Sequence, residues 1–296
     1  MRKILALLLI ITQSAVAQIG FSDQYQFNPI AHNPAMAGER GFFGVTSMVG
    51  YRFVGGIRPL NSSLVLSMDA QLGEDGKNAI GFQGFKSSVG LNIPNQGISF
   101  CYSKVIEAGD VIIKAGLNAG TLITPNNFGN TTLGDRALPF LGFGAAAILP
   151  KAFVSIGSPS LLAKSQYNFW SNRTTFIGAG YRIGTYENIA ANFSVISGFQ
   201  HNEAAVNFLH LNTKVWFTNK LGIGPSIRLS QNKQSRFAFT GELRVSQSFT
   251  LGLSYDQNPL AGYNISQFDK YNGLFQILIK YDSFLSGTDS PFMNQF

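Results

Sequence analysis

Charged side chains are scarce in this sequence of 296 residues, since Asp, Glu, Lys and Arg together make up only 12% of it. Soluble domains carry about 25% charged residues, so the composition argues against an ordinary soluble protein. Long apolar runs are also missing beyond the first residues, and no later stretch approaches the roughly 18 apolar residues of a membrane helix. These two absences favour a transmembrane β-barrel, whose apolar outer face and polar inner face average to a moderate hydropathy.

Cysteine and histidine are rare as well, which argues against several kinds of chemistry. The single Cys101 has no partner for a disulfide, and its place within an alternating strand favours a packed thiol over a nucleophile. The three histidines, His32, His201 and His210, show no metal-ligand spacing. We therefore expect no enzymatic activity, no cofactor and no metal site. The net charge of +7 is spread along the chain, and we expect no nucleic acid among its partners.

The first residues predict a secretory signal peptide. Arg2 and Lys3 form a basic start, "ILALLLII" forms a short apolar core, and Ala15-Val16-Ala17 provides a small-residue cleavage site. The predicted organisation is therefore a signal peptide over 1–17, a periplasmic lead-in over 18–42 and an outer-membrane β-barrel over 43–296. The predicted location is the outer membrane of a Gram-negative bacterium.

Alternation with a period of two recurs along the remaining chain. In "VIIKAGLNAG", residues 111–120, apolar side chains take one face, while Lys, Gly and Asn take the other. The stretches "NIAANFSVIS", "GELRVSQS" and "NGLFQILIKYD" behave in the same way. A soluble β-sandwich would alternate equally well, but its strands are usually shorter than the ten or so residues found here. The pattern therefore favours an all-β, antiparallel transmembrane barrel.

The alternating segments number about fourteen, an even count as in bacterial outer-membrane barrels. We place them near 43–54, 61–72, 77–88, 96–107, 109–123, 139–149, 150–158, 173–184, 186–200, 203–218, 219–231, 234–246, 247–256 and 271–282. The connections after even-numbered segments are short, whereas the three longest follow odd-numbered segments: "TPNNFGNTTLGDRA", "SPSLLAKSQYNFWSN" and "QNPLAGYNISQFDKY". This asymmetry predicts short periplasmic turns and longer extracellular loops.

Aromatic residues gather near the predicted strand ends, where interfacial girdles lie in membrane barrels. They are Phe42, Phe43, Tyr51, Phe53, Tyr181, Tyr186, Trp216, Phe217 and Tyr281. With 26 Phe residues in the chain, part of this clustering is expected by chance, so it supports the barrel only weakly.

Ionisable residues also fall on the face that the register directs inward. They are Asp69, Lys114, Arg182, Lys214, Arg228, Glu242, Arg244 and Lys280. Such groups are costly in a low-dielectric wall unless they are paired or hydrated. They would either cross-link a closed interior or line a water-filled channel. A barrel of fourteen strands is wide, so we expect side chains, the N-terminal segment and folded-in loops to fill its lumen.

The segment before the first strand, "QYQFNPIAHNPAMAG", is rich in turn-forming residues. Its two Asn-Pro pairs, Asn28-Pro29 and Asn33-Pro34, hold the asparagines extended and block a helix there. The small residues from Ala35 to Gly38 allow backbone to pass close to other backbone. The segment could fold back into the periplasmic mouth of the barrel or form an ordinary turn-rich lead-in, and both interpretations stay open.

This stretch and the one after it resemble the PorP/SprF family, outer-membrane proteins linked to the type IX secretion system of the Bacteroidetes. The resemblance lies in the Asn-Pro entry, the Asn-Pro-Ala-x-Ala-Gly run ending at Gly38, a first strand ending in Tyr51-Arg52 and a hairpin bearing Pro59. Family members often continue the Tyr-Arg pair with Gln-Trp, whereas Phe53-Val54 follow here. That departure weakens any inference about a shared contact of the first loop.

The resemblance implies an interaction protein that acts with the type IX machinery and binds an exported protein with a type IX sorting domain, such as an adhesin. Periplasmic ring components of that machinery are a further implied partner. Gliding, adhesion and nutrient capture all remain open as the outcome. The long loops would carry the contacts, and the residues that resemble interface anchors are Tyr167, Phe169, Trp170, Tyr263 and Phe268. These aromatics would pack equally well onto the barrel rim.

A channel for small or hydrophobic solutes is the alternative. Transporters of the FadL type also have fourteen strands and an Asn-Pro-Ala element near the lumen, to which Asn33-Pro34-Ala35 would correspond. Those proteins have a longer chain with a substantial N-terminal hatch, whereas the lead-in here spans only some twenty residues. The sequence therefore favours the interaction protein over the transporter.

Overall fold

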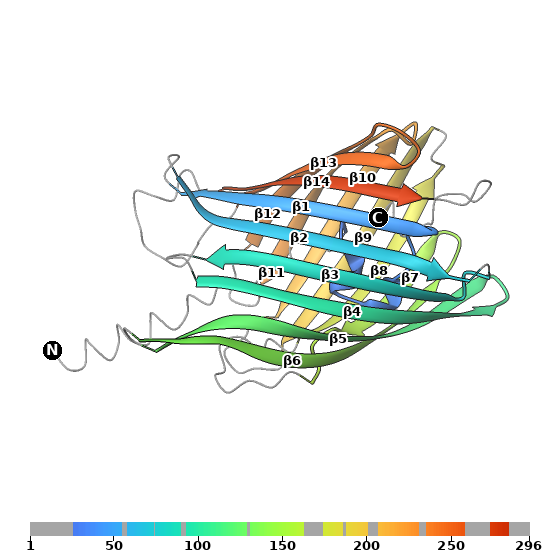
Figure 1. Cartoon of the computed structure of the whole chain (residues 1–296). Coiled ribbons are helices and arrows are strands. Elements are labelled where there is room, and N and C mark those ends of the chain that lie inside the picture. Colours follow the sequence, from blue (N-terminus) through green and yellow to red (C-terminus); the bar gives the residue numbers. More distant parts are fainter. Residues whose placement is uncertain are drawn as a thin grey trace.

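The computed structural model in Figure 1 is a closed antiparallel β-barrel of fourteen strands. It describes residues 26–54, 58–73, 75–89, 93–128, 131–162, 174–185, 188–200, 207–230, 235–257 and 273–283. The strands are β1 (Phe43–Val54), β2 (Arg58–Leu72), β3 (Asn78–Val89), β4 (Ile93–Ala108), β5 (Val111–Phe128), β6 (Thr131–Ile148), β7 (Ala152–Ser158), β8 (Thr174–Gly184), β9 (Ile189–Gln200), β10 (Phe208–Phe217), β11 (Leu221–Ser230), β12 (Ser235–Arg244), β13 (Phe249–Gln257) and β14 (Gly273–Ser283).

The barrel closes between the first and last strands. β1 pairs with β14 from Phe43 opposite Ser283 to Phe53 opposite Gly273, and every other strand pairs with its neighbours in the chain. The predicted fold class and strand count are confirmed, and most strand ends differ from the predicted ones by only a few residues. No helix in the described residues is long and apolar enough to cross a membrane.

Side chains alternate between the outer and inner faces of the wall. In β10, Phe208, His210 and Lys214 are buried in the interior, whereas Leu209 and Leu211 are exposed on the outside. The same alternation exposes leucine, isoleucine and phenylalanine around the outer surface. Because the paired strands satisfy their own backbone hydrogen bonds, the apolar outer face can lie in hydrocarbon without unpaired peptide groups.

Outward aromatic residues form a row near the long-loop end. Tyr51 lies opposite Phe275, Phe275 opposite Tyr255, and Tyr255 opposite Phe239, so the row crosses four neighbouring strands. The ring centroids of Tyr255 and Phe275 are 5.4 Å apart. At the other end, exposed aromatic side chains include Phe43, Tyr181, Phe217 and Tyr281. Exposed aromatic side chains at both ends match the girdles of outer-membrane barrels.

One predicted girdle residue, Trp216, faces the other way. Its side chain points into the lumen and is only 1% exposed, while the next residue, Phe217, faces outward. Successive side chains of a strand point to opposite faces of the sheet. Lying near the strand end therefore did not determine whether the Trp216 side chain faces outward or inward. The side chains of Phe53 and Tyr186 lie outside the described residues.

The predicted long loop "TPNNFGNTTLGDRA" is wrong. β5 continues to Phe128 and β6 begins at Thr131, so most of that stretch extends the hairpin. The pairing register shifts between Pro125 and Asn127, and this irregularity accommodates a proline within a paired strand. The hairpin therefore projects beyond its neighbours, as the two green strands in Figure 1 show.

The other connections keep the predicted asymmetry. The connections after even-numbered strands are short, and the two longest, residues 159–173 and 258–272, follow β7 and β13. The tightest short turn joins β4 to β5 through Gly109 and Asp110. Gly109 has a φ of +64°, a conformation that glycine adopts without strain. In bacterial outer-membrane barrels, the short-turn end faces the periplasm.

Candidate functional site

The N-terminal segment, defined here as residues 26–41, lies inside the barrel in its short-turn half, where Figure 1 shows it in blue behind the front strands. It contains two short 3-10 helices, η2 (Pro29–Ala31) and η3 (Pro34–Met36). Phe27 and Met36 are each 2% exposed, and Ala35 is fully buried. Of the two structures that the sequence left open for this segment, the fold has it inside the lumen.

The two Asn-Pro pairs produce the local shape. Asn33 is extended, with φ −146° and ψ 106°, and its side-chain oxygen accepts a hydrogen bond of 3.0 Å from the backbone N–H of Ala35. Pro34 then occupies the first helical position, where its fixed φ suits a helix and its missing N–H costs nothing. Asn28 and Pro29 stand in the same positions at η2, without the side-chain cap. The segment thus turns twice within a few residues and stays compact.

Glycines in the wall make room for this compact segment. Gly116 on β5 lies against the backbone of Ala35, and a Cβ at that position would overlap it. Gly144 on β6 lies against the Asn33 side chain, and Gly157 on β7 lies against the His32 carbonyl and the Asn33 backbone. The side-chain amide of Asn33 also donates a hydrogen bond of 3.0 Å to the carbonyl of Ala145. Three neighbouring strands therefore provide a surface that fits the backbone of the segment.

A buried ion pair fixes the end of the segment that leads into β1. The Arg40 guanidinium pairs with the Asp69 carboxylate on β2, and both side chains are at most 2% exposed. Arg40 also donates to the Thr46 hydroxyl, and the Gly38 N–H donates to Asp69 at 2.7 Å. A deeply buried ion pair is stable only when the other hydrogen-bond donors and acceptors of its two side chains also have partners. The contacts with Thr46 and Gly38 supply two of these partners.

A second buried pair joins the segment to β5. The Lys114 ammonium lies 2.6 Å from the Glu39 carboxylate and donates to the Ala37 carbonyl at 2.8 Å. The Ser103 hydroxyl donates to the same carbonyl at 2.9 Å. The polar groups at this end of the segment are thus bound to four strands of the wall, β1, β2, β4 and β5.

The other end of the segment packs against β1, β2 and β14 and reaches a side chain of β10. Phe27 forms an apolar cluster with Met48, Val65 and Leu278. The Lys214 ammonium lies 5.1 Å from the centroid of the Phe27 ring and forms an ion pair with Glu242 that is 2% exposed on both sides. The segment therefore spans the lumen from β5 to β10 and contacts both walls.

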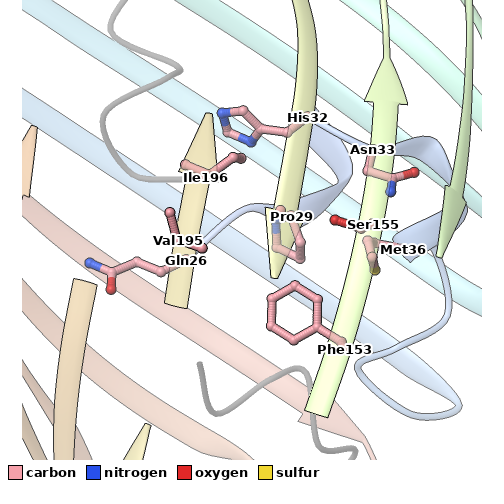
Figure 2. A pocket seen from close by; sticks show the side chains of 10 residues that line it. Gln26, Pro29, His32, Asn33, Met36, Phe153, Ser155, Val195 and Ile196 are labelled. Carbon is pink, nitrogen blue, oxygen red and sulfur yellow. The ribbon is translucent and has the colours of Figure 1, made fainter. Parts of the chain in front are cut away.

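A small hollow remains between the segment and strands β7 to β9. Figure 2 shows Gln26, Pro29 and His32 of the segment around it, together with Phe153 of β7 and Ile196 of β9. Its lining is mostly apolar, and the His32 ring packs edge-on against Phe176 with centroids 4.8 Å apart. Among the described residues, no group of three or more His, Cys, Asp or Glu side chains is placed to hold a metal ion.

The eight ionisable residues predicted for the lumen all lie on the inward-facing positions of their strands. Asp69, Lys114, Lys214, Arg228, Glu242 and Lys280 are buried. Arg182 and Arg244 are half-buried near the short-turn end, where Arg182 donates to the Pro150 carbonyl at 3.0 Å and Arg244 to the Asn219 side chain at 2.5 Å. The Arg228 guanidinium lies 3.8 Å from the centroid of the Phe208 ring.

Besides the buried Asp256 and Asp282 of β13 and β14, the sequence reasoning missed two ionisable residues of the N-terminal segment, Glu39 and Arg40. They precede the first strand, so the period-two pattern gave them no face. The available signal was a pair of opposite charges directly after the Asn-Pro-Ala-Met-Ala-Gly run, in a chain where charge is scarce. They supply the partners of Lys114 and Asp69, which the predicted set had left unpaired.

The remaining predicted site residues are not brought together. Tyr51 lies on the outer face, 42% exposed, within the aromatic row. Arg52 and Pro59 lie in β1 and β2, and their side chains are outside the described residues. The loop aromatics Tyr167, Phe169, Trp170, Tyr263 and Phe268 also lie outside the described residues.

Comparison with known proteins identifies the family. The family model of the type IX secretion system membrane protein PorP/SprF matches residues 15–281. The chain belongs to the PorP/SprF family. This membership and the barrel fold make it an integral protein of the outer membrane associated with type IX secretion. No curated protein matches the sequence.

Solved structures share the barrel architecture at low sequence identity. The outer membrane protein Omp33 of Acinetobacter baumannii is 13% identical with a TM-score of 0.51, over 82% of this chain and 98% of that one. The KdgM porin in complex with oligogalacturonate is 6% identical with a TM-score of 0.41, over 81% and 99%. A variant of the Rh. blastica porin is 8% identical with a TM-score of 0.41, over 81% and 99%. At 13% sequence identity, the similarity to Omp33 supports a shared fold only.

Proposed function

We propose that this barrel works with the type IX secretion machinery by binding an exported partner protein, such as an adhesin, for secretion or attachment at the cell surface. Membership of the PorP/SprF family supports the link to the machinery. The observation that favours binding over transport is the N-terminal segment, which occupies the short-turn half of the lumen and is fixed there by buried ion pairs.

The electrostatics of the lumen also support this proposal. A channel for polar solutes keeps its charged side chains hydrated, because desolvated charges are costly. Here Lys214 and Glu242 are buried and paired with each other, and Lys114 and Asp69 are buried and paired with the N-terminal segment. These groups cross-link the interior rather than line an aqueous path.

Affinity capture from native outer membranes tests the proposed function. The tagged barrel is isolated after cross-linking, and the captured proteins are identified by mass spectrometry. The expected result is an exported protein that carries a type IX sorting domain, in a complex that survives washing. Recovery of no such protein, together with robust uptake of small or hydrophobic solutes into cells, would favour the FadL-like transporter instead.

The proposed function also includes cleavage of the leader and further partners in the periplasm. We infer that the leader is removed after Ala17, which N-terminal sequencing of the outer-membrane form tests directly. Periplasmic ring components of the machinery would bind at the short-turn end, since that end faces the periplasm in such barrels. The protein acts by binding, without catalysis, cofactor or metal.

A further inference from the structure

The outer face of the barrel wall carries few ionisable side chains. On the outward strand positions whose side chains the structure describes, tyrosines aside, the ionisable residues are Lys86 on β3 and Lys104 on β4, and neither Asp nor Glu occurs. A charged side chain on the lipid face of a barrel costs most at the middle of the bilayer and little near its boundaries. Each of these lysines is therefore expected near a boundary of the bilayer and close to a counter-ion.

Lys104 lies near the boundary at the short-turn end. The other outward residues of β4 from Ile98 to Ile106 are apolar or aromatic, and Ile106 is 54% exposed. A tilted strand rises about 2.5 Å per residue along the membrane normal, so Lys104 lies about 5 Å inside the end of this apolar band. The long apolar stem of lysine lets its ammonium reach the headgroup layer from that depth. Lys86 lies opposite Gln96 of β4, about 20 Å farther along the membrane normal and thus near the other boundary.

A second polar side chain, that of Asn78 on β3, lies beside Lys104. The two residues are direct cross-strand partners, so their side chains begin about 5 Å apart on the same face. The Tyr102 hydroxyl donates a hydrogen bond of 2.5 Å to the side-chain oxygen of Asn78. Because its oxygen accepts this bond, Asn78 has its amide N–H groups left to donate. Lys104 and Asn78 thus present hydrogen-bond donors side by side, which suits an anion with several oxygens.

The protein itself supplies no carboxylate to Lys104 within the described part of the chain. Glu107, at the rim of the same strand, lies 3.9 Å from Lys77 instead. Chain segments outside the described residues are no substitute, because irregular backbone with unpaired peptide groups is not stable on a lipid-facing wall at this depth. A second copy packed on this face would bring no carboxylate either, since its own described outward strand positions hold none. A membrane lipid is the remaining source of an anion here.

The residues around Lys104 also suit the rest of a lipid molecule. On the membrane side of Lys104, Tyr102 lies between Ile80 on β3 and Leu117 on β5, and all three side chains are exposed on the outer face. At the height of Lys104, Ala115 lies opposite it on β5. The small alanine side chain leaves room for a headgroup beside the lysine, while the larger apolar side chains offer contact to acyl chains.

We propose that Lys104 and Asn78 bind the phosphate of an anionic phospholipid in the periplasmic leaflet of the outer membrane, with its acyl chains along Tyr102 and its apolar neighbours. The leaflet follows from the short-turn end, which faces the periplasm in such barrels. A lipid with net negative charge is favoured over a zwitterionic one, because the lysine charge then has a counter-ion without a competing ammonium beside it. The site does not depend on the exported partner.

Lipid titration followed by native mass spectrometry tests the site. Phosphatidylglycerol is added in steps to the full-length barrel in a nonionic detergent, and the fraction of barrel that carries bound lipid gives an apparent affinity. A lysine near anionic lipid contributes about fivefold to binding, so Lys104→Gln should weaken the binding of phosphatidylglycerol by about that factor. Lys104→Arg keeps the charge and should bind like the wild type. Phosphatidylcholine, which carries no net charge, should bind more weakly to the wild type than phosphatidylglycerol does.

Two further variants separate the site from general attraction of lipid to a basic protein. Lys151→Gln removes the same charge at the same end of the barrel, but from the exposed turn between β6 and β7, and should keep the wild-type affinity. Asn78→Leu removes the second donor and should weaken the binding of phosphatidylglycerol by about threefold. Heat-modifiable mobility on gels verifies that every variant forms the barrel.

The same titrations can overturn the inference. Equal affinity of wild type and Lys104→Gln would show that Lys104 binds no lipid, and an equal loss in Lys104→Gln and Lys151→Gln would show a general attraction to basic residues. Displacement of phosphatidylglycerol by excess inorganic phosphate would identify a site for a free anion instead. None of these results bears on the proposed function, which the capture of an exported partner tests separately.

Discussion

The two halves of this barrel differ in what completes them. In the short-turn half, the chain supplies its own contents: the N-terminal segment lies on wall glycines, and its Glu39 and Arg40 pair with buried groups of the strands. In the long-loop half, β5 and β6 extend past their neighbours, and within the described part of the chain the outer residues of β6 pair with β5 alone. The contrast separates an inner half that its own N-terminal segment fills from an outer half in which the described residues place no such segment.

The largest expected effect comes from breaking the buried pair of the inner half. Arg40→Leu leaves the Asp69 carboxylate buried without its counter-ion, and removing one member of such a pair costs about 3–5 kcal/mol. The free energy of unfolding, measured by urea titration in lipid vesicles with Trp fluorescence, should fall by that amount. The double variant Arg40→Leu/Asp69→Leu should recover much of the loss, and an equal loss in both would contradict the pairing.

The apolar end of the segment gives a comparable or slightly smaller effect. Phe27→Ala removes a ring that is 2% exposed and packs on Met48, Val65 and Leu278, and such truncations cost about 3–5 kcal/mol in soluble proteins. The same urea titration measures it. Phe42→Ala is the matched control, because Phe42 is 48% exposed on the outside and should change stability far less.

The glycine surface of the wall offers a way to displace the segment without touching it. Gly116→Val places a side chain where the Ala35 backbone lies, so the segment should lose its place and the barrel should begin to conduct ions in planar bilayers. Gly241→Val is the control, since a Cβ at Gly241 meets nothing within 4 Å. Equal conductance in the two variants would show that Gly116 has no part in closing the lumen.

The smallest effect belongs to an ion pair at the rim. Lys77 and Glu107 lie 3.9 Å apart, and their side chains are 49% and 60% exposed. Exposed pairs contribute about 0–1 kcal/mol, so Lys77→Ala should change the unfolding free energy by less than about 0.5 kcal/mol. If Lys77→Ala lowered the unfolding free energy as much as Arg40→Leu, burial would not explain the difference in strength between the two ion pairs.

The architecture could be predicted from the sequence because apolar and polar residues alternate along a barrel strand according to the face on which each side chain lies. The alternation of residues 111–120 predicted both the existence of β5 and the inward direction of Lys114. Turn chemistry was less informative. The Pro, Asn and Gly residues of 124–137 predicted a loop, yet pairing between β5 and β6 absorbs them in two long strands with one irregularity.

The contents of the lumen were harder to predict, because they depend on contacts between residues far apart in the chain. Asp69 was placed inward by its strand, but its partner Arg40 lies in an irregular segment with no periodicity. Trp216 was assigned to a girdle although its neighbour Phe217 is the residue that faces outward. The Asn-Pro pairs of residues 28–34 predicted a turn-rich chain without a helix, whereas a short 3-10 helix begins at each proline because its fixed φ suits the first helical position. The position of the segment inside the barrel required the structure.

We propose that the N-terminal segment closes this barrel from within, so that the protein acts by binding rather than by transport. Ion conductance of the purified full-length wild-type protein in planar bilayers tests this claim most directly. The wild type should pass no steady current, and only Gly116→Val and similar variants should open a conducting path. A steady current of porin size through the wild type would contradict it.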